Sequence, residues 1–237
     1  MINGKSILGL IPARSGSKRL PGKNTKLLLG KPLVAWTIEQ ALASKYLDKV
    51  IVSTDSEEIA KISRNFGAEV PFLRPKELAF DNSKSIDVVL HTLRYFEDVE
   101  RYSPDIIVLL QPTSPLRTKE DIDKALEIFT MNKCVSLISV CEAPKHFLWL
   151  FEIKEGFLKH FNSLEGYLFN DTLPRLYSPN GAIYIADTKT LETYRTFYIE
   201  KLCYYIMSYE RGIDIDTEVD LIIAEALLKR GSSYTEE

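Results

Sequence analysis

The 237-residue sequence lacks several features that would assign a chain to a function class directly. It has no run near the ~20 apolar residues that a membrane helix needs. Its first residues lack the charged, apolar and small-residue zones of a signal peptide. Its histidines (His91, His146 and His160) are too scattered for a metal triad. Positive charge is not in excess, because 30 basic and 33 acidic residues give a net charge of −3, which argues against nucleic acid as a partner.

These absences favour a cytoplasmic protein that binds neither membrane nor nucleic acid. The three cysteines, Cys134, Cys141 and Cys203, form no C-x-x-C or histidine-linked metal pattern. Because each lies in or beside an apolar stretch, we expect reduced, mostly buried thiols. Hydrophobic residues make up 45% and charged residues 27% of the chain, as in ordinary globular proteins. The length suffices for one large or two small domains.

Apolar strand-like runs alternate with stretches of helical period through most of the chain. Runs typical of buried strands occupy residues 6–11, 49–54, 105–110, 135–140, 182–186 and 202–207. Helical spacing is found at residues 33–44, from 55 onward, and at 84–102, 119–131 and 217–229. Continuously apolar strands that alternate with helices predict an α/β fold with three layers, in which helices cover both faces of a mostly parallel sheet.

The alternation stops between residues 142 and 179, where aromatic residues accumulate without a long helical period. One interpretation is an irregular cluster beneath a long loop. The other is a β-rich arm that buries its aromatics against a second subunit. With the arm, the chain divides into an N-terminal part of the α/β domain (1–141), the arm (142–179) and a C-terminal part of the same domain (180–237).

A small, basic, glycine-bearing loop follows the first predicted strand. Its sequence is Ile-Pro-Ala-Arg-Ser-Gly-Ser-Lys-Arg-Leu-Pro-Gly-Lys-Asn, at residues 11–24. Small residues let backbone N–H groups approach an anion, and Arg14, Lys18, Arg19 and Lys23 supply positive charge. The loop matches neither the G-x-G-x-x-G nor the Walker pattern. It predicts a phosphate site; the alternative is a solvated basic turn.

Other polar residues also follow predicted strands. Asp55 follows the second strand, residues 111–115 (Gln-Pro-Thr-Ser-Pro) follow the strand at 105–110, and Asp214 and Asp216 follow the strand at 202–207. In open α/β sheets, ligands bind outside the carboxyl ends of the strands. These residues are therefore expected to surround one cleft with the basic loop.

The Asp214-Ile-Asp216 pair is a candidate metal site. In an extended segment residues two apart point to the same side, and two carboxylates suit Mg²⁺, which also takes oxygens from substrate phosphates. Mn²⁺ is the other candidate. Alternatively, Asp216 caps the helix that starts near Thr217 while Asp214 faces solvent. Asp220 fits the first turn of that helix.

Four segments, in order along nearly the whole chain, resemble the acylneuraminate cytidylyltransferase family, which activates sialic acid and related acidic sugars. They are the loop at 11–24, Leu-Leu-Gln-Pro-Thr-Ser-Pro-Leu-Arg-Thr at 109–118, Pro-Asn-Gly-Ala-Ile-Tyr at 179–184, and Ile-Asp-Ile-Asp-Thr-Glu-Val-Asp-Leu at 213–221. The resemblance implies a nucleotidyltransferase (Rossmann-like) fold. It also implies transfer of CMP from CTP to the anomeric hydroxyl of a nine-carbon 2-keto acidic sugar, release of pyrophosphate, and a homodimer joined through the arm.

The resemblance also implies roles for single residues. Asp214 and Asp216 match metal-binding positions, and Gln111 matches a residue near the sugar acceptor. Asn180 lies in the third matching segment, although a turn role would also explain it. Arg117 lies in the second matching segment, but it could equally pair with Glu120 or Asp121 on the surface. The CTP contacts implied are Arg14, Ser17, Lys23, Asn24, Arg74 and Ser85. Arg14, Lys23, Gln111 and the two aspartates are the catalytic candidates.

The sequence departs from the sialic acid branch at the sugar end. An arginine usually precedes the Pro-Asn-Gly segment, but here the residue is Ser178. The lysine and arginine of the family's arm align with Leu148 and Asn170, and Lys145 and Arg175 lie close by. These two cations are candidates to bind the sugar carboxylate. N-acetylneuraminic, legionaminic and pseudaminic acids all remain candidate substrates.

Two other functions compete with this interpretation. A metal-dependent sugar-phosphate phosphohydrolase with an aspartyl nucleophile would carry its D-x-D directly after the first strand, but here the pair lies near the C-terminus. A non-catalytic sugar-nucleotide sensor would not need the metal and phosphate residues together.

Overall fold

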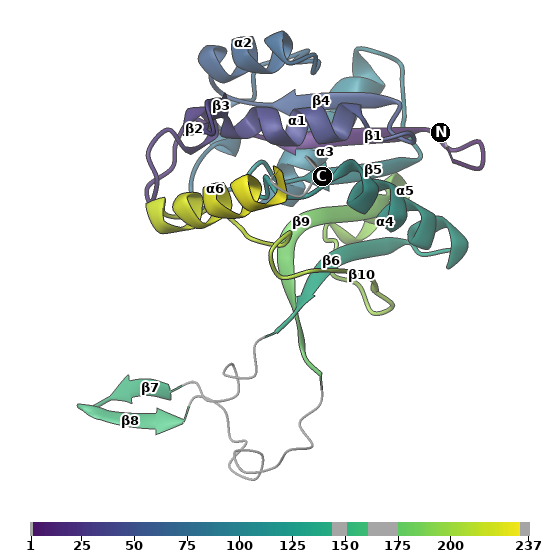
Figure 1. Cartoon of the computed structure of the whole chain (residues 1–237). Helices are drawn as coiled ribbons and strands as arrows, with labels where there is room; N and C mark the ends of the chain where they lie inside the picture. Colours follow the sequence, from purple (N-terminus) through teal and green to yellow (C-terminus); the bar gives the residue numbers. More distant parts are fainter. Residues whose placement is uncertain (1, 144–150, 161–174, 233–237) are drawn as a thin grey trace.

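The computed structural model describes residues 2–143, 151–160 and 175–232 of the chain. A six-stranded sheet forms the centre, in the order β10-β6-β9-β5-β1-β4 (Figure 1). Its strands are β1 (Ile7–Pro12), β4 (Lys49–Ser53), β5 (Ile106–Leu110), β6 (Ser136–Glu142), β9 (Tyr177–Asp187) and β10 (Cys203–Met207). Short strands β2 (Leu27–Leu28) and β3 (Lys31–Pro32) form a separate hairpin.

The sheet is mostly parallel, as the sequence predicts. β1 pairs in parallel with β4 and β5, and β10 pairs in parallel with β6. Among the described strands of this sheet, β9 alone runs antiparallel to its neighbours β5 and β6. The chain moves from β1 to β4 on one side and later to β5 on the other, so the order reverses at β1. Ligand sites of open α/β sheets lie at such a reversal.

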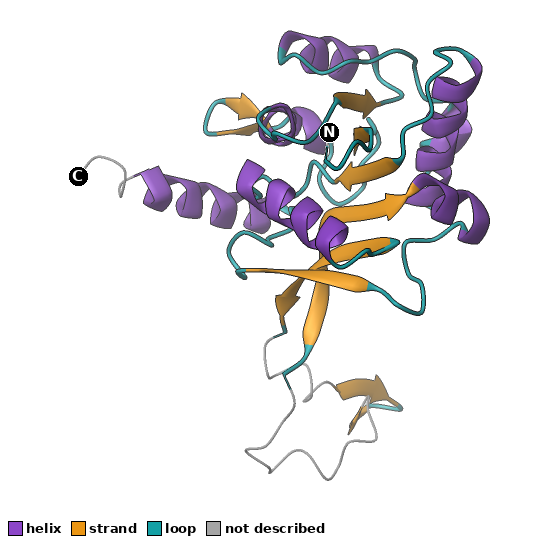
Figure 2. Ribbon diagram, turned by 90° about the vertical axis from the view of Figure 1, so that its right-hand side faces the viewer, coloured by secondary structure: helices purple, strands orange, loops and turns teal. Residues whose placement is uncertain are grey.

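Helices cover both faces of the sheet (Figure 2). Alternation along each strand separates the core into two layers: Ile106, Val108 and Leu110 face one cluster, whereas Ile107 and Leu109 face the other. The first cluster packs α1 (Leu33–Leu42), α2 (Glu57–Asn65) and α4 (Lys119–Met131); the second packs α3 (Ser85–Asp98) and α5 (Thr188–Tyr194). No helix in the described part of the chain has the length and apolar character to cross a membrane.

The C-terminal helix α6 (Glu218–Ser232) packs against residues from the N-terminal part of the chain. Its Leu221 and Ala224 share a buried cluster with Leu20 and Leu28, which follow the first strand. Ile215, in the segment that leads into α6, is fully buried in the same cluster. Burial of these side chains fixes the basic loop against the segment that carries Asp214 and Asp216, because apolar area is removed from water on both sides.

Two sequence-based expectations need correction. The helix expected at residues 84–102 ends at Asp98, and Arg101, in the connection to β5, has a positive φ of 53°. The cysteines are not all reduced: Cys134 and Cys203 form a disulfide, with Cα atoms 6.1 Å apart, and Cys141 is free and buried. The pairing of β6 with β10 brings the two residues together across a separation of 69 residues, which spacing alone does not indicate.

The segment expected to form an arm lies partly outside the described residues. Its described part includes a hairpin of β7 (Phe151–Lys154) and β8 (Phe157–His160), which Figure 1 draws away from the sheet, beyond the ends of β6 and β9. Glu155 and Gly156 both have positive φ in the turn, as a two-residue hairpin turn requires. Ile153, Phe157 and Leu158 are exposed on this hairpin.

Candidate active site

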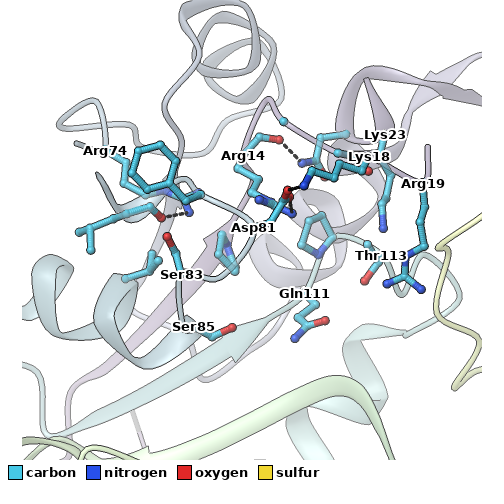
Figure 3. A pocket seen from close by; sticks show the side chains of 18 of the residues that line it. Arg14, Lys18, Arg19, Lys23, Arg74, Asp81, Ser83, Ser85, Gln111 and Thr113 are labelled. Atoms are coloured by element: carbon cyan, nitrogen blue, oxygen red, sulfur yellow. Dashed lines mark hydrogen bonds and ion pairs between the residues drawn. The ribbon is translucent and has the colours of Figure 1, made fainter. Parts of the chain in front are cut away.

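A cavity of about 490 Å³ opens at the carboxyl ends of β1 and β5 (Figure 3). The loop after β1, the segment before α3 and the turn after β5 all line it, and Asp216 reaches it from the C-terminal part of the chain. Five basic and two acidic side chains are among the lining residues: Arg14, Lys18, Arg19, Lys23, Arg74, Asp81 and Asp216. The cavity is therefore electropositive and suits an anion with several phosphates.

The basic loop is held by its neighbours in a fixed path. The Asn24 side-chain amide donates a hydrogen bond to the Arg14 carbonyl (2.8 Å). Asp55 accepts hydrogen bonds from the Ser15 backbone N–H (2.8 Å) and hydroxyl (2.6 Å). Burial acts to raise the pKa of Asp55, but the hydrogen bonds from Ser15, together with one from its own backbone and the charge of Arg74, hold the pKa below its usual value. Asp55, which follows β4, is thus an anchor of this loop.

Each acidic side chain of the cavity bridges two cations. Asp81 lies 2.8 Å from Arg14 and 2.7 Å from Lys18. Asp216 lies 2.8 Å from Arg19 and 2.9 Å from Lys23. In Figure 3 Arg14 and Lys18 converge on Asp81, and Lys23 and Arg19 lie toward one end of the cavity. All four cations of the loop line the cavity; Lys18 and Arg19 remain largely exposed to solvent, whereas Arg14 and Lys23 are more buried.

Arg74 and Ser85 lie at the other end of the cavity, and Figure 3 draws Ser83 between these two residues. Arg74 is 5% exposed and donates hydrogen bonds to the Ser53 and Leu78 carbonyls, while its buried Nε has no hydrogen-bond partner among the described residues. Burial lowers the pKa of Arg74 to about 10, against the opposing effect of Asp55. Ser85 is the first residue of α3, where backbone N–H groups favour oxygen acceptors.

The turn after β5 contributes Gln111 and Thr113 to the cavity. The Gln111 side chain lies against Gly181, where a Cβ atom would come within 3.2 Å of its Oε1; Gly181 also has a positive φ of 76°. Arg117, expected as a surface residue, is instead fully buried. It donates hydrogen bonds to the carbonyls of Gln111 (3.1 Å) and Ala182 (2.7 Å), and burial lowers its pKa to about 9.

The structure separates the two aspartates of the D-x-D pair. Asp216 lines the basic cavity, whereas Asp214 lines a neighbouring cavity of about 310 Å³ together with Asn180 and Asp220. In this second cavity, surrounding protein atoms partly remove the Asp214 carboxylate from water. This desolvation raises the pKa of Asp214, and the negative charge of Asp216 raises it further. Asp214 and Asp216 nevertheless supply carboxylate oxygens, the kind of ligand that Mg²⁺ takes. The described residues contain no cluster of three metal-ligating side chains, so phosphate or water oxygens would complete such a site.

Asp216 does not cap α6. Thr217 stands at the cap position instead: its hydroxyl accepts a hydrogen bond from the Asp220 backbone N–H (3.4 Å), and its backbone N–H donates to Asp220 Oδ2 (2.7 Å). Asp220 is thus a first-turn residue of the helix, as the sequence predicts. The carboxylate of Asp216 is left to face the cations of the loop.

The residues expected at the sugar end are only partly brought to the two cavities. Asn180 is held by the protein: its Oδ1 accepts a hydrogen bond from the Ser139 hydroxyl (2.6 Å), and its Nδ2 points to the sulfurs of Cys141 and Met207. Arg175 is exposed two residues before β9 and lines neither cavity. Lys145, Leu148 and Asn170 lie outside the described residues.

Several cavity residues were missed from the sequence: Phe80, Asp81 and Ser83, which precede α3. Thr113 was expected at the cleft as part of the turn at residues 111–115, and it does line the cavity. Asp81 and Ser83 carried no usable signal, because polar residues before a helix normally have a turn or capping role.

Comparison with known proteins decides the family. A family model described as cytidylyltransferase matches residues 8–206, which is most of the chain and includes the loop after β1 and the turn after β5. The chain belongs to this cytidylyltransferase family. It is a nucleotidyltransferase, as the basic cavity at the sheet edge indicates.

Relatives within this family are named for different acidic sugars. The chain is 41% identical over 228 residues to the CMP-N,N'-diacetyllegionaminic acid synthase of Legionella pneumophila, covering 94% of this chain and 96% of the relative. It is 31% identical to the pseudaminic acid cytidylyltransferase of Campylobacter jejuni (94% and 96%). It is 37% identical to the N-acylneuraminate cytidylyltransferase of Escherichia coli (92% of this chain), of which it spans about half (51%).

A solved structure confirms the fold. The chain superposes with a TM-score of 0.73 on a CMP:2-keto-3-deoxy-manno-octonic acid synthetase complexed with CTP, over 95% of this chain and 99% of the other, at 18% sequence identity. The α/β fold of this cytidylyltransferase is therefore shared with a nucleotidyltransferase of low sequence similarity.

Proposed function

We propose that this cytidylyltransferase transfers CMP from CTP to the anomeric hydroxyl of a nine-carbon 2-keto acidic sugar and releases pyrophosphate. The observation that carries the proposal is the cavity at the ends of β1 and β5, in which five basic side chains meet an aspartate from the C-terminal part of the chain. The names of the relatives support the same reaction. The anomeric oxygen would attack the α-phosphorus directly, and pyrophosphate would leave.

In this proposal the loop after β1 binds the triphosphate. Arg14 and Lys23 are the central cations, since both are partly buried and both are held at fixed positions by other residues. Ser17 lines the same wall, and Asn24 acts by holding the Arg14 carbonyl. Charge neutralisation and alignment supply most of the rate enhancement in transfer of phosphoryl-type groups.

Arg74 and Ser85 would bind the nucleoside. The unpartnered Nε of Arg74 is a buried donor beside the cavity, and a buried donor without a partner is costly unless a ligand accepts its hydrogen bond. The apolar side chains of Leu78, Phe80 and Val88 line the same cavity. A cytosine ring, with acceptors at its edge and apolar faces, fits this combination.

Asp214 and Asp216 would hold a divalent cation, Mg²⁺ or Mn²⁺. When bound, such an ion neutralises negative charge on the phosphates and on the leaving pyrophosphate. In the structure the Asp216 carboxylate forms ion pairs with Arg19 and Lys23. The same carboxylate would therefore also orient these two cations toward the phosphates. Gln111 lies in the cavity and would position the sugar, or a water molecule that accepts the proton of the anomeric hydroxyl.

The sugar would bind beside Gln111, with help from Asn180 and the arm. Relatives named for legionaminic, pseudaminic and neuraminic acids support the class of nine-carbon acids and leave the individual sugar open. We further propose that the arm, residues 142–179, forms a homodimer and that Lys145 or Arg175 binds the sugar carboxylate. We place the protein in the cytoplasm, although disulfides such as Cys134–Cys203 are rare there.

Release of pyrophosphate from CTP tests the proposal. The protein is incubated with CTP and Mg²⁺, with and without each of the three nine-carbon acids, and pyrophosphate is measured by a coupled assay. We expect release that requires both CTP and one of the acids. Release of inorganic phosphate from sugar phosphates instead would indicate the phosphohydrolase. Binding without any turnover across the panel would indicate the sensor.

A further inference from the structure

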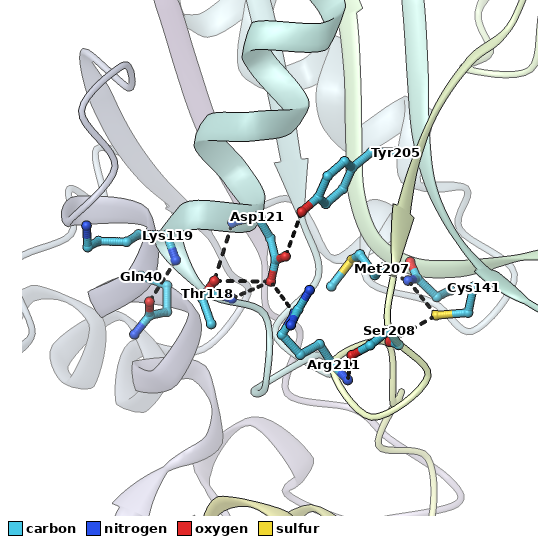
Figure 4. Close-up of polar contacts among 10 residues, drawn as sticks. Gln40, Thr118, Lys119, Asp121, Cys141, Tyr205, Met207, Ser208 and Arg211 are labelled. Atoms are coloured by element: carbon cyan, nitrogen blue, oxygen red, sulfur yellow. Dashed lines mark hydrogen bonds and ion pairs between the residues drawn. The ribbon is translucent and has the colours of Figure 1, made fainter. Parts of the chain in front are cut away.

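A buried carboxylate outside the cavity connects α4 to the segment that carries Asp214 and Asp216. Asp121 lies in the first turn of α4, and its side chain is only 3% exposed. Its Oδ2 accepts hydrogen bonds from the Thr118 backbone N–H (3.0 Å) and hydroxyl (3.2 Å), and these bonds cap the helix. Its Oδ1 accepts a third, from the Tyr205 hydroxyl (2.9 Å), which belongs to β10 (Figure 4).

Arg211 completes this arrangement from the segment between β10 and α6. Its Nε lies 3.2 Å from Asp121 Oδ2. The Arg211 side chain is 43% exposed, so it comes from the surface to a carboxylate that water hardly reaches. The buried guanidinium of Arg117 also attracts the Asp121 carboxylate, but among the described ion pairs Arg211 is the one in direct contact with it. Removal of one partner of a buried ion pair is strongly destabilising. Arg211 is therefore held at Asp121 more firmly than the partners of an exposed ion pair would be.

Arg211 lies just before the segment that carries Asp214 and Asp216. The position of Arg211 therefore affects the path of this segment. Gly212 packs so closely against Cys141 and Asn180 that a Cβ atom would overlap the Cys141 sulfur. Asp214 comes two residues later, and the Ile215 backbone N–H then donates to the Thr113 carbonyl (2.8 Å). The segment is thus anchored at Arg211 on one side of Asp214 and at Ile215 on the other.

A helix cap alone does not require these contacts. A capping box is complete with the Thr118 and Asp121 bonds, yet Asp121 also binds one residue of β10 and one of the segment beyond it. We infer that Arg211 is a positioning residue, which acts through Asp121 to fix the segment that presents Asp214 and Asp216 to the cavity. The inference rests on the proposed metal role of these two aspartates.

Three substitutions separate positioning from stability. Arg211→Gln removes the charge that faces Asp121, and Arg211→Lys keeps a charge without the planar fork. Tyr205→Phe removes a hydrogen bond from the same carboxylate without altering the segment. Arg195→Gln is the control, because Arg195 makes an exposed ion pair with Asp87 away from the cavity.

Two readouts are measured well below the unfolding temperature, on variants that circular dichroism shows to be folded. The first is the Kd for Mn²⁺ of the CTP-saturated protein, from the electron paramagnetic resonance signal of free Mn²⁺, with a protein-free CTP titration subtracted. The second is amide hydrogen exchange across residues 208–216. We expect Arg211→Gln to raise the Kd about ten-fold, as loss of outer partners of metal ligands commonly does, and to speed exchange in this segment.

The pattern across the variants decides the inference. Arg211→Lys should fall between the wild type and Arg211→Gln, while Tyr205→Phe and Arg195→Gln should stay within about two-fold of the wild-type Kd, which corresponds to less than 0.5 kcal/mol. If Arg211→Gln leaves Kd and exchange unchanged while Asp216→Ala abolishes binding, the positioning role is wrong and the metal site stands. Equal weakening by Tyr205→Phe would show loss of stability instead. If Asp216→Ala retains Mn²⁺ binding, the metal role falls, and the positioning role with it.

Discussion

Lys23 and Asp216 are 193 residues apart in the sequence and lie side by side in the cavity, with Lys23 Nζ 2.9 Å from Asp216 Oδ1. The same Nζ donates a hydrogen bond to the Ile215 carbonyl (2.8 Å). Because the Lys23 side chain is mostly buried, this contact is less screened by solvent than an exposed ion pair. It joins the phosphate-binding loop to the acidic segment, and the proposed reaction needs both.

Replacement of the loop cations should weaken CTP binding. We expect Lys23→Met and Arg14→Lys each to raise the Kd for CTP about ten-fold to a hundred-fold, the loss expected for a charge-assisted hydrogen bond. Arg14→Lys belongs in this set because an ammonium lacks the bidentate fork of a guanidinium. The measurement is calorimetry at fixed salt.

Lys26→Met is the matched control for these variants, because Lys26 follows the same loop but pairs with Glu218 and does not line the cavity. It should bind CTP as the wild type does. Unchanged CTP affinity in both Lys23→Met and Arg14→Lys would remove the loop from the nucleotide site.

Asp55 should make the stability of the fold depend on pH. Its pKa is held below the usual value in the folded protein by the hydrogen bonds from Ser15, against the effect of burial. A lowered pKa means that the stabilisation is present above the unfolded-state pKa, about 3.9, and is lost as the pH falls through the folded-state value.

We therefore expect Asp55→Asn to unfold at lower urea concentration than the wild type near pH 7, by about 1–2 kcal/mol, and the difference to shrink in acid. Asp87→Asn, which changes an exposed pair with Arg195, is the control. If Asp55→Asn remained less stable than the wild type by the same free energy at about pH 3 as at about pH 7, the assignment would be wrong.

The disulfide determines how many thiols of the chain can be titrated, and this number can be measured directly. Denatured without reductant, the chain should titrate one thiol, that of Cys141, and after reduction it should titrate three. Reduction should also lower the free energy of unfolding by about 2–4 kcal/mol, since the bond closes a long loop. Cys141→Ser should bring the unreduced count to zero. Three thiols without reductant would restore the expectation from the sequence.

Mixed dimers test the arm. Subunits with Asp216→Ala are mixed with subunits that carry both Lys145→Ala and Arg175→Ala. If each sugar site takes its cation from the partner, a mixed dimer holds both defects in one cleft and leaves the other cleft intact. Random exchange should then restore about a quarter of the clefts. A monomer in light scattering, or no recovery after mixing, would contradict the shared site.

Prediction from the sequence succeeded where the signal was local. Buried strands are visible as apolar runs, and the polar residues that follow them converge because parallel strands end at one edge. The basic loop and Gln111 could therefore be placed in one cavity before the fold was known. The helix at Lys119–Met131 was predicted with its observed bounds from its helical spacing.

Long-range relationships were not visible in the sequence. The burial of Arg117 was not visible because its acceptors, two backbone carbonyls and the Thr37 hydroxyl, lie in other segments of the chain or carry no sequence signature. Cys134 and Cys203 meet through strand pairing between β6 and β10. Asp214 and Asp216 were expected to face one side, but the buried Ile215 between them fixes a path in which they line neighbouring cavities.

Phosphorus NMR of the complete reaction tests the central claim most directly. CTP, Mg²⁺ and each nine-carbon acid are incubated with the wild type and with Asp216→Ala, and all phosphorus-containing products are followed. The account predicts that the wild type converts CTP into equal amounts of a CMP diester of the sugar and pyrophosphate, only when the acid is present, and that Asp216→Ala forms little of either. Inorganic phosphate, free CMP without a sugar ester, or an unchanged CTP spectrum with every acid would contradict it.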